Sequence, residues 1–290
     1  MEELTLSRQY AILALDGQDS LHDSLAKSAV LRAVAAALVL EAGLEKEKVE
    51  EAVFTAKGLK KREAKKLENE IVLFLKEEDL LEEVPDILGC DINYYTAGLE
   101  LKAYRSEKET YVTSKEGLRK ELLEEQEPQE KTILLLWLLR ESGCLHELFS
   151  ALEQEKVQEK MLALTLQNEL YKLVWEAQFH SSLESLSSNF LKAKSNLFKN
   201  PFLQGINLAF PYLERRKAIF IDMVVLNTTV MNRREQTINF LKEMGQQVEE
   251  MKKGEMAVLK INNALYQIFP MTKRYSMVPV QGVYLVPIYY

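Results

Sequence analysis

The sequence is poor in cysteine and histidine, and neither residue type is arranged for a disulfide framework or a metal site. Two cysteines, Cys90 and Cys144, and three histidines occur in 290 residues. A disulfide-stabilised scaffold needs several paired cysteines, and a structural zinc site needs ligands at short spacings that neither cysteine offers. We therefore expect no metal and no disulfide, and two reduced, buried thiols.

The chain also lacks an excess of basic residues. Its 37 lysines and arginines are outnumbered by 44 aspartates and glutamates, which gives a formal net charge of −7. Nucleic-acid binders neutralise phosphates with clustered cations, and a chain of net negative charge opposes that attraction. We expect no nucleic-acid partner.

Signals for secretion or membrane insertion are missing as well. The N-terminus begins Met-Glu-Glu and has neither the basic residues nor the apolar stretch of a secretory signal. The apolar runs, such as residues 33–40 and 133–139, are far shorter than the ~20 residues that span a bilayer. These absences predict a cytoplasmic protein whose contacts with any membrane are peripheral.

The sequence contains none of the common catalytic motifs. There is no glycine-rich phosphate loop, no His-Glu-x-x-His pair, no Cys-x-x-Cys pair and no Gly-x-Ser-x-Gly elbow. His22, Asp23 and Ser24 are adjacent, but a nucleophile, a base and an orienting group must converge in space, so this triplet predicts a helix start. We expect no cofactor and no enzymatic activity.

Helical periodicity dominates the first two thirds of the chain, where the 47% hydrophobic content supplies an ample core. Residues 7–15 and 22–42 predict two helices, the second of which is apolar on nearly every side and ends at Gly43. Such a helix is normally enclosed by others, so we expect it at the centre of a bundle. Between residues 84 and 114 the pattern weakens and favours a β-hairpin. Further helices are predicted at 46–55, 59–75, 133–139 and 153–198.

After residue 200 the composition changes to β-branched runs. Residues 233–253 predict one helix, which gives the order β-α-β-β. The terminal residues 275–290 carry no charge, so we expect them inside the fold. The predicted fold class is mainly α, with a helical bundle over 1–200 and a small α+β unit over 201–290. Strands are predicted at 218–225, 256–261, 265–269 and 278–288.

The densest basic group lies between residues 57 and 66, where six cations accompany one glutamate. Such a group can hold an anionic headgroup or a charged bilayer, with each cation contributing about 1 kcal/mol. Alternatively it is a solvated helix face, because Glu63, Glu68 and Glu70 stand three or four residues from cations. A second basic group, residues 215–217, precedes a predicted strand and is expected to guard a sheet edge. The cations of the first group are Lys57, Lys60, Lys61, Arg62, Lys65 and Lys66.

The opening of the chain resembles the GPP34 family, the Golgi phosphoprotein 3-like proteins. The resemblance rests on Leu-Thr-Leu at 4–6, on Ala-Ile-Leu-Ala-Leu-Asp-Gly at 11–17, and on Leu31-Arg32 followed by Ala-Ala-Ala-Leu-Val-Leu-Glu-Ala-Gly-Leu at 35–44. It implies a helical fold without catalysis that, in eukaryotic members, binds phosphatidylinositol 4-phosphate through a tryptophan and several arginines. Arg32 falls at one of those arginines. The family's tryptophan position corresponds to residues 22–23 and its arginine pair to residues 126–130, and this sequence has neither residue type there. Of the pocket residues, only Arg32 has a counterpart in this chain.

Together these observations predict a non-catalytic binding module. Its expected partner is an anionic lipid headgroup or membrane surface, bound by Arg32, Lys57, Lys60, Lys61, Arg62 and Lys65. The alternative is a protein-interaction module that engages a protein partner through the C-terminal α+β unit.

Overall fold

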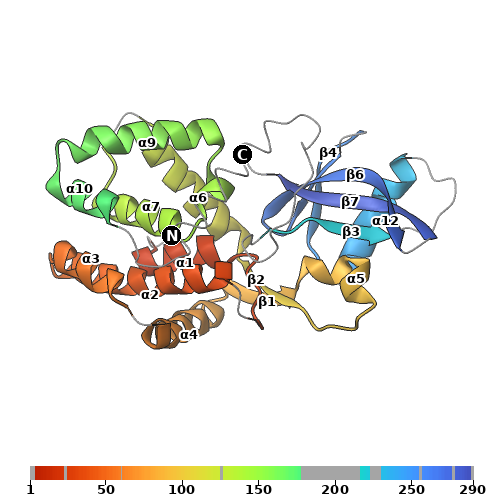
Figure 1. Cartoon of the computed structure of the whole chain (residues 1–290), viewed down its shortest axis with the longest axis horizontal. Coiled ribbons are helices and arrows are strands. Elements are labelled where there is room, and N and C mark those ends of the chain that lie inside the picture. Colours follow the sequence, from red (N-terminus) through yellow and green to blue (C-terminus); the bar gives the residue numbers. More distant parts are fainter. Residues whose placement is uncertain are drawn as a thin grey trace.

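The computed structural model describes residues 4–22, 25–59, 61–124, 127–177, 216–222, 230–254, 257–275 and 278–288. The fold is mixed α+β and mainly helical. In Figure 1 most of the helices lie on the left and a five-stranded sheet lies on the right, with the two-stranded sheet of β1 and β2 between them. The predicted boundary at residue 200 falls outside the described residues and remains a prediction.

The first four helices form one side of the helical part. They are α1 (Leu6–Leu15), α2 (Leu25–Glu45), α3 (Val49–Lys57) and α4 (Lys61–Glu77). As predicted, α2 is buried over most of its length and contacts α1, α3, α4 and α7 (Glu130–Glu141). The prediction that α2 ends at Gly43 was wrong. Gly43 lies inside the helix, where a Cβ would stand 2.4 Å from the Cβ of Ala52, so the glycine lets α3 pack closely against α2.

The hairpin predicted between residues 84 and 114 is a pair of strands without a tight turn. Strands β1 (Leu81–Pro85) and β2 (Lys102–Ser106) are antiparallel, and the chain between them forms the 3-10 helix η1 (Ile87–Cys90) and the short helix α5 (Ile92–Tyr95). Asp86 and Asp91 cap these two helices, because each carboxylate accepts a hydrogen bond from the backbone two residues later.

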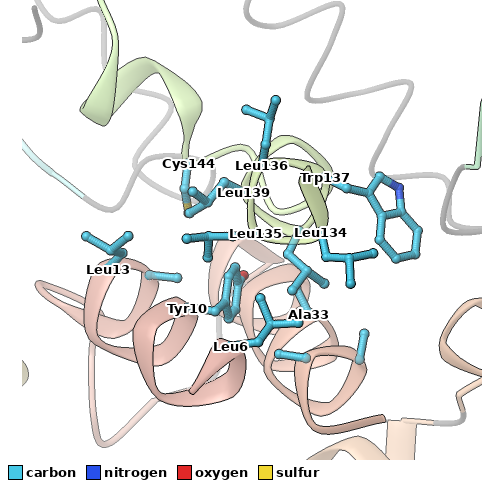
Figure 2. Close-up of a cluster of buried hydrophobic side chains, with 14 of the residues drawn as sticks. Leu6, Tyr10, Leu13, Ala33, Leu134, Leu135, Leu136, Trp137, Leu139 and Cys144 are labelled. Atoms are coloured by element: carbon cyan, nitrogen blue, oxygen red, sulfur yellow. The ribbon is translucent and has the colours of Figure 1, made fainter. Parts of the chain in front are cut away.

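The described residues form further helices in the same part of the molecule. They are α6 (Lys108–Leu123), α7, α8 (Leu145–Leu148), α9 (Ala151–Thr165) and α10 (Glu169–Glu176). Figure 2 shows why the run 133–139 is apolar throughout: side chains of α7 point in several directions, toward Tyr10 and Ala33 on one side and away from them on the other. The predicted buried helix at this run is confirmed, with residues 132–139 all buried.

The single long helix predicted over 153–198 is wrong over its described part. Helix α9 ends at Thr165, and Asn168 caps the start of α10, since its side chain accepts hydrogen bonds from the backbone of Leu170 and Tyr171. Leu162 and Leu166, near the end of α9, are exposed. Residues 178–198 lie outside the described residues.

The C-terminal sheet has the order β3-β7-β6-β5-β4, and every pairing is antiparallel. Helix α12 (Val230–Glu243) follows β3. The prediction of one helix over 233–253 was wrong in its second half, because Gly245 adopts a left-handed conformation with φ +82° and the chain continues as a strand. The order is therefore β-α-β-β-β-β. The strands are β3 (Ile219–Asp222), β4 (Val248–Lys252), β5 (Val258–Ile261), β6 (Ala264–Tyr275) and β7 (Val278–Ile288).

The terminal segment belongs to the fold, as predicted. Strand β7 lies between β3 and β6, and Val283 and Leu285 are almost fully buried. Gly282 pairs regularly and forms no bulge. Only glycine fits at this position, because a Cβ there would lie 2.2 Å from the carbonyl oxygen of Ile221. Residues 289–290 lie outside the described residues.

Two hydrophobic clusters make up the core. The larger lies among the helices, and the smaller lies between the sheet, α12 and η1. Cys144 belongs to the larger and Cys90 to the smaller, and both are buried free thiols, as predicted. Within the described residues, none of the helices has the length and apolar character needed to cross a membrane.

Candidate functional site

Helices α3 and α4 carry the basic surface, which we define by its described residues Phe54, Lys57, Lys65 and Lys66. Helix α3 buries Val49, Ala52, Val53 and Ala56 against α2 and the core. Phe54 points the other way and is 62% exposed, which is unusual for a phenylalanine. The ammonium of Lys57, at the end of the same helix, lies 5.9 Å from the centre of the Phe54 ring.

Helix α4 carries the other two described cations. Lys65 and Lys66 are exposed, and Lys66 pairs with Glu70 one turn later at 3.8 Å. This pair is the kind expected of a solvated face, and at this exposure it adds only about 0.3–0.5 kcal/mol of stability. Lys60 lies outside the described residues, as do the side chains of Lys61 and Arg62.

Arg32, the remaining predicted ligand residue, lies on α2. It is partly buried and makes no hydrogen bond or ion pair with another residue of the described part of the chain. Helix α2 contacts both α3 and α4, so Arg32 belongs to the same group of helices as the basic surface. No contact that the structure describes joins Arg32 to Lys57 or Lys65.

A second site, which sequence reasoning missed, lies where the helices meet the sheet. The guanidinium of Arg216 pairs with Asp16, at the end of α1, and its Nε lies 3.4 Å from a carboxylate oxygen of Glu147 on α8. Asp16 also accepts hydrogen bonds of 2.9 Å from the backbone of Ser106 and from the side chain of Asn263. Burial opposes the charge on Arg216, but the two carboxylates outweigh it and raise its pKa.

Beside this ion pair lies a cleft of about 220 Å³, the junction cleft. Its walls come from α6, α8, the sheet and Arg216, and they include Lys115, Glu116 and Lys260. Lys115 is only 8% exposed. Burial lowers the pKa of its ammonium to about 8, helped by the positive charges of Arg119 and Arg216 and opposed by Glu116 and Glu147.

The sequence contained a signal for both Lys115 and Arg216, although the one for Arg216 was misinterpreted. Lys115 stands at helical spacing among Tyr111, Leu118 and Leu122, all of which are buried, so the periodicity of α6 already places a lysine on its inner face. Arg216 was expected to guard a sheet edge, and that prediction was wrong because the side chain turns inward to two carboxylates. Arg215 lies outside the described residues.

Comparisons with known proteins add no relative, since the chain matches no family model, no curated protein and no solved structure. The resemblance of residues 4–44 to the GPP34 family therefore remains a prediction. In the part of the chain that the structure describes, no group of three or more histidine, cysteine, aspartate or glutamate side chains is placed to hold a metal ion.

Proposed function

We propose that this chain is a non-catalytic binding module, of GPP34-like fold in its helical part, that docks on anionic membranes through the basic surface. The observation that carries the proposal is the exposed ring of Phe54 beside Lys57. An aromatic ring that inserts among lipid headgroups, flanked by lysines that attract anionic lipids, is the combination that peripheral binding needs.

The strength of such docking follows from its two parts. Each lysine near an anionic surface contributes about 1 kcal/mol, and burying the Phe54 ring adds up to about 2 kcal/mol. The net charge of −7 repels the same surface, but this repulsion is screened beyond ~8 Å at physiological salt. Binding is therefore weak, reversible and sensitive to salt.

The test is co-sedimentation of the full chain with vesicles of phosphatidylcholine that contain or lack phosphatidylserine. The variant Lys65→Glu/Lys66→Glu reverses two exposed charges of the basic surface. Its matched control, Lys156→Glu/Lys172→Glu, reverses two exposed lysines on α9 and α10. We expect the first variant to lose at least tenfold in binding and the second to bind like the parent.

Equal losses in both variants, or binding that ignores salt and phosphatidylserine, would remove the basic surface from consideration. A further comparison separates general charge from headgroup recognition. Vesicles with phosphatidylinositol 4-phosphate and vesicles with phosphatidylserine are matched in charge, and Arg32→Ala is compared with the parent on each. If Arg32 recognises the headgroup, this variant loses binding to the phosphoinositide vesicles alone.

The alternative function, protein interaction through the C-terminal unit, is favoured by a separate observation. Strands β6 and β7 pair with each other beyond the ends of their neighbours, and Met271 and Val278 are exposed on this projecting part. An exposed apolar ribbon of this kind is suited to a protein partner. Substituting both residues by serine leaves lipid binding unchanged under the membrane proposal.

A further inference from the structure

The junction cleft contains a lysine, Lys115, that lacks the solvent exposure normal for a lysine on a helix surface. Lys115 is on the inner face of α6, is 8% exposed, and lines a cleft that opens between the helices and the sheet. Burial makes the charged ammonium less favourable relative to the neutral amine, because charged groups are better solvated in water. This position therefore invites a chemical explanation.

The groups around Lys115 favour a neutral amine. Arg119 lies one turn further along α6, and Arg216 lies across the cleft, and both positive charges disfavour a third. Glu116 and Glu147 act in the opposite direction, and each also lies beside an arginine, Glu116 at 3.5 Å from Arg119 and Glu147 at 3.4 Å from Arg216. Burial is the largest effect, and it brings the pKa of Lys115 to about 8. A desolvated lysine beside other cations is the usual form of an activated amine nucleophile.

We propose that the junction cleft is a binding site for small α-oxo acids, in which the amine of Lys115 forms an imine with the oxo carbon. The nitrogen of the neutral amine bonds to the carbonyl carbon, and the carbonyl oxygen leaves as water together with both amine protons. Lys260, on the β5 wall of the cleft, supplies a positive charge for the carboxylate of the ligand. A cleft of about 220 Å³ is below the size of sites for drug-like ligands and suits a molecule of a few carbon atoms.

The test uses the full chain with glyoxylate as the probe. The protein is exposed briefly to glyoxylate over a range of pH and quenched with sodium borohydride, which reduces the imine to a stable carboxymethyl group. Peptide mapping by mass spectrometry then gives the extent of labelling at each lysine. Lys120, exposed on the same helix, is the internal control.

With a pKa of about 8 instead of 10.5, the neutral fraction of Lys115 at pH 7 is roughly three-hundredfold larger. Allowing for restricted access, we expect labelling of Lys115 to be at least tenfold faster than that of Lys120 and to reach half its maximum near pH 8. The variant Lys260→Gln should slow labelling by glyoxylate several-fold while leaving labelling by glycolaldehyde, which has no carboxylate, unchanged.

Two results would overturn the proposal. Labelling of Lys115 that is no faster than that of Lys120 would show that the cleft neither activates nor admits the ligand. Equal labelling of Lys115 by glyoxylate and glycolaldehyde in the parent and in Lys260→Gln would show that the cleft does not select an acid. Neither result bears on membrane docking, because the junction cleft and the basic surface share no residue.

Discussion

Arg216 shows how one residue can connect two cores. Its guanidinium lies between Asp16 and Glu147, and all three side chains are at least nine-tenths buried. A buried charge whose partner is removed is strongly destabilising, because it keeps its desolvation cost without the compensating attraction. The pairing thus ties the chain before β3 to helices that are far away in the sequence.

The variant Arg216→Met leaves two buried carboxylates without their cation, so we expect the free energy of unfolding at pH 7 to fall by about 3 kcal/mol. Urea denaturation measures it. Adding Asp16→Asn should recover part of the loss, because the amide oxygen still accepts the hydrogen bonds from Ser106 and Asn263. A variant as stable as the parent would contradict the role assigned to Arg216.

Replacing Lys115 is expected to raise the free energy of unfolding, in contrast to replacing Arg216, and this effect should depend on pH. Its folded pKa of about 8 lies below the unfolded value, so the unfolded chain holds this proton up to about pH 10.5 while the folded chain loses it above about pH 8. The charged lysine therefore destabilises the fold below pH 8, and this cost disappears as pH rises to 10.5. The free energy of unfolding of Lys115→Met should exceed that of the parent by about 3 kcal/mol at pH 7 and should be nearly the same at pH 10.5. A stability difference that does not change with pH would refute this.

At the scale of elements, the close contact of α2 and α3 depends on the absence of a side chain at Gly43. In Gly43→Ala the new Cβ would lie 2.4 Å from that of Ala52, so the helices must separate, at a cost of about 1–3 kcal/mol. Ala52→Gly in the same chain makes room for it. Thermal unfolding should show a large penalty for Gly43→Ala in the parent and a small one in the Ala52→Gly background. The same penalty in both would mean that the clash is relieved elsewhere.

Strand β7 is the element on which the sheet depends. Deleting residues 283–290 removes the part of β7 that pairs with most of β3 and with the first half of β6, including the buried side chains of Val283 and Leu285. It uncovers the buried residues Ile219, Ile221 and Ile268. At ~25 cal/mol per Å² of apolar surface this costs several kcal/mol. We expect the shortened chain to aggregate or to lose a cooperative transition in circular dichroism, whereas deleting only residues 289–290 should change neither. A soluble 1–282 chain with the parent's melting curve would contradict the central position of β7.

Sequence patterns located most elements and missed their ends. Helices α1, α2, α3, α4 and α7 and strands β3, β5, β6 and β7 were found because their apolar residues recur at helical or strand spacing. The errors occur where a backbone conformation or a packing contact overrides the pattern. Gly43 reads as a helix end but serves close packing, Gly245 interrupts what reads as one helix, and Asn168 caps a new helix inside a continuous leucine pattern.

At the scale of the whole molecule, the two hydrophobic clusters meet across a polar junction. Arg105 donates a 3.2 Å hydrogen bond to Asn262, and Gln246 donates one of 2.8 Å to the carbonyl of Pro85, in addition to the contacts of Asp16. The sequence could not predict this junction, because its partners lie up to 247 residues apart and no local period links them. The basic surface was visible in sequence as a charge run, whereas the exposure of Phe54 required the structure.

The proposal of membrane docking is tested most directly by asking whether Phe54 touches lipid. In Phe54→Trp, tryptophan emission should shift to shorter wavelength on mixing with phosphatidylserine vesicles and should be quenched by brominated lipid. The parent, whose own tryptophans are the fully buried Trp137 and Trp175 beside Arg140, is measured as the background. Leu166→Trp, at the exposed C-terminal end of α9, is the matched control and should not respond. Emission from Phe54→Trp that stays unchanged while the protein sediments with the vesicles, or an equal response of Leu166→Trp, would contradict docking through the basic surface.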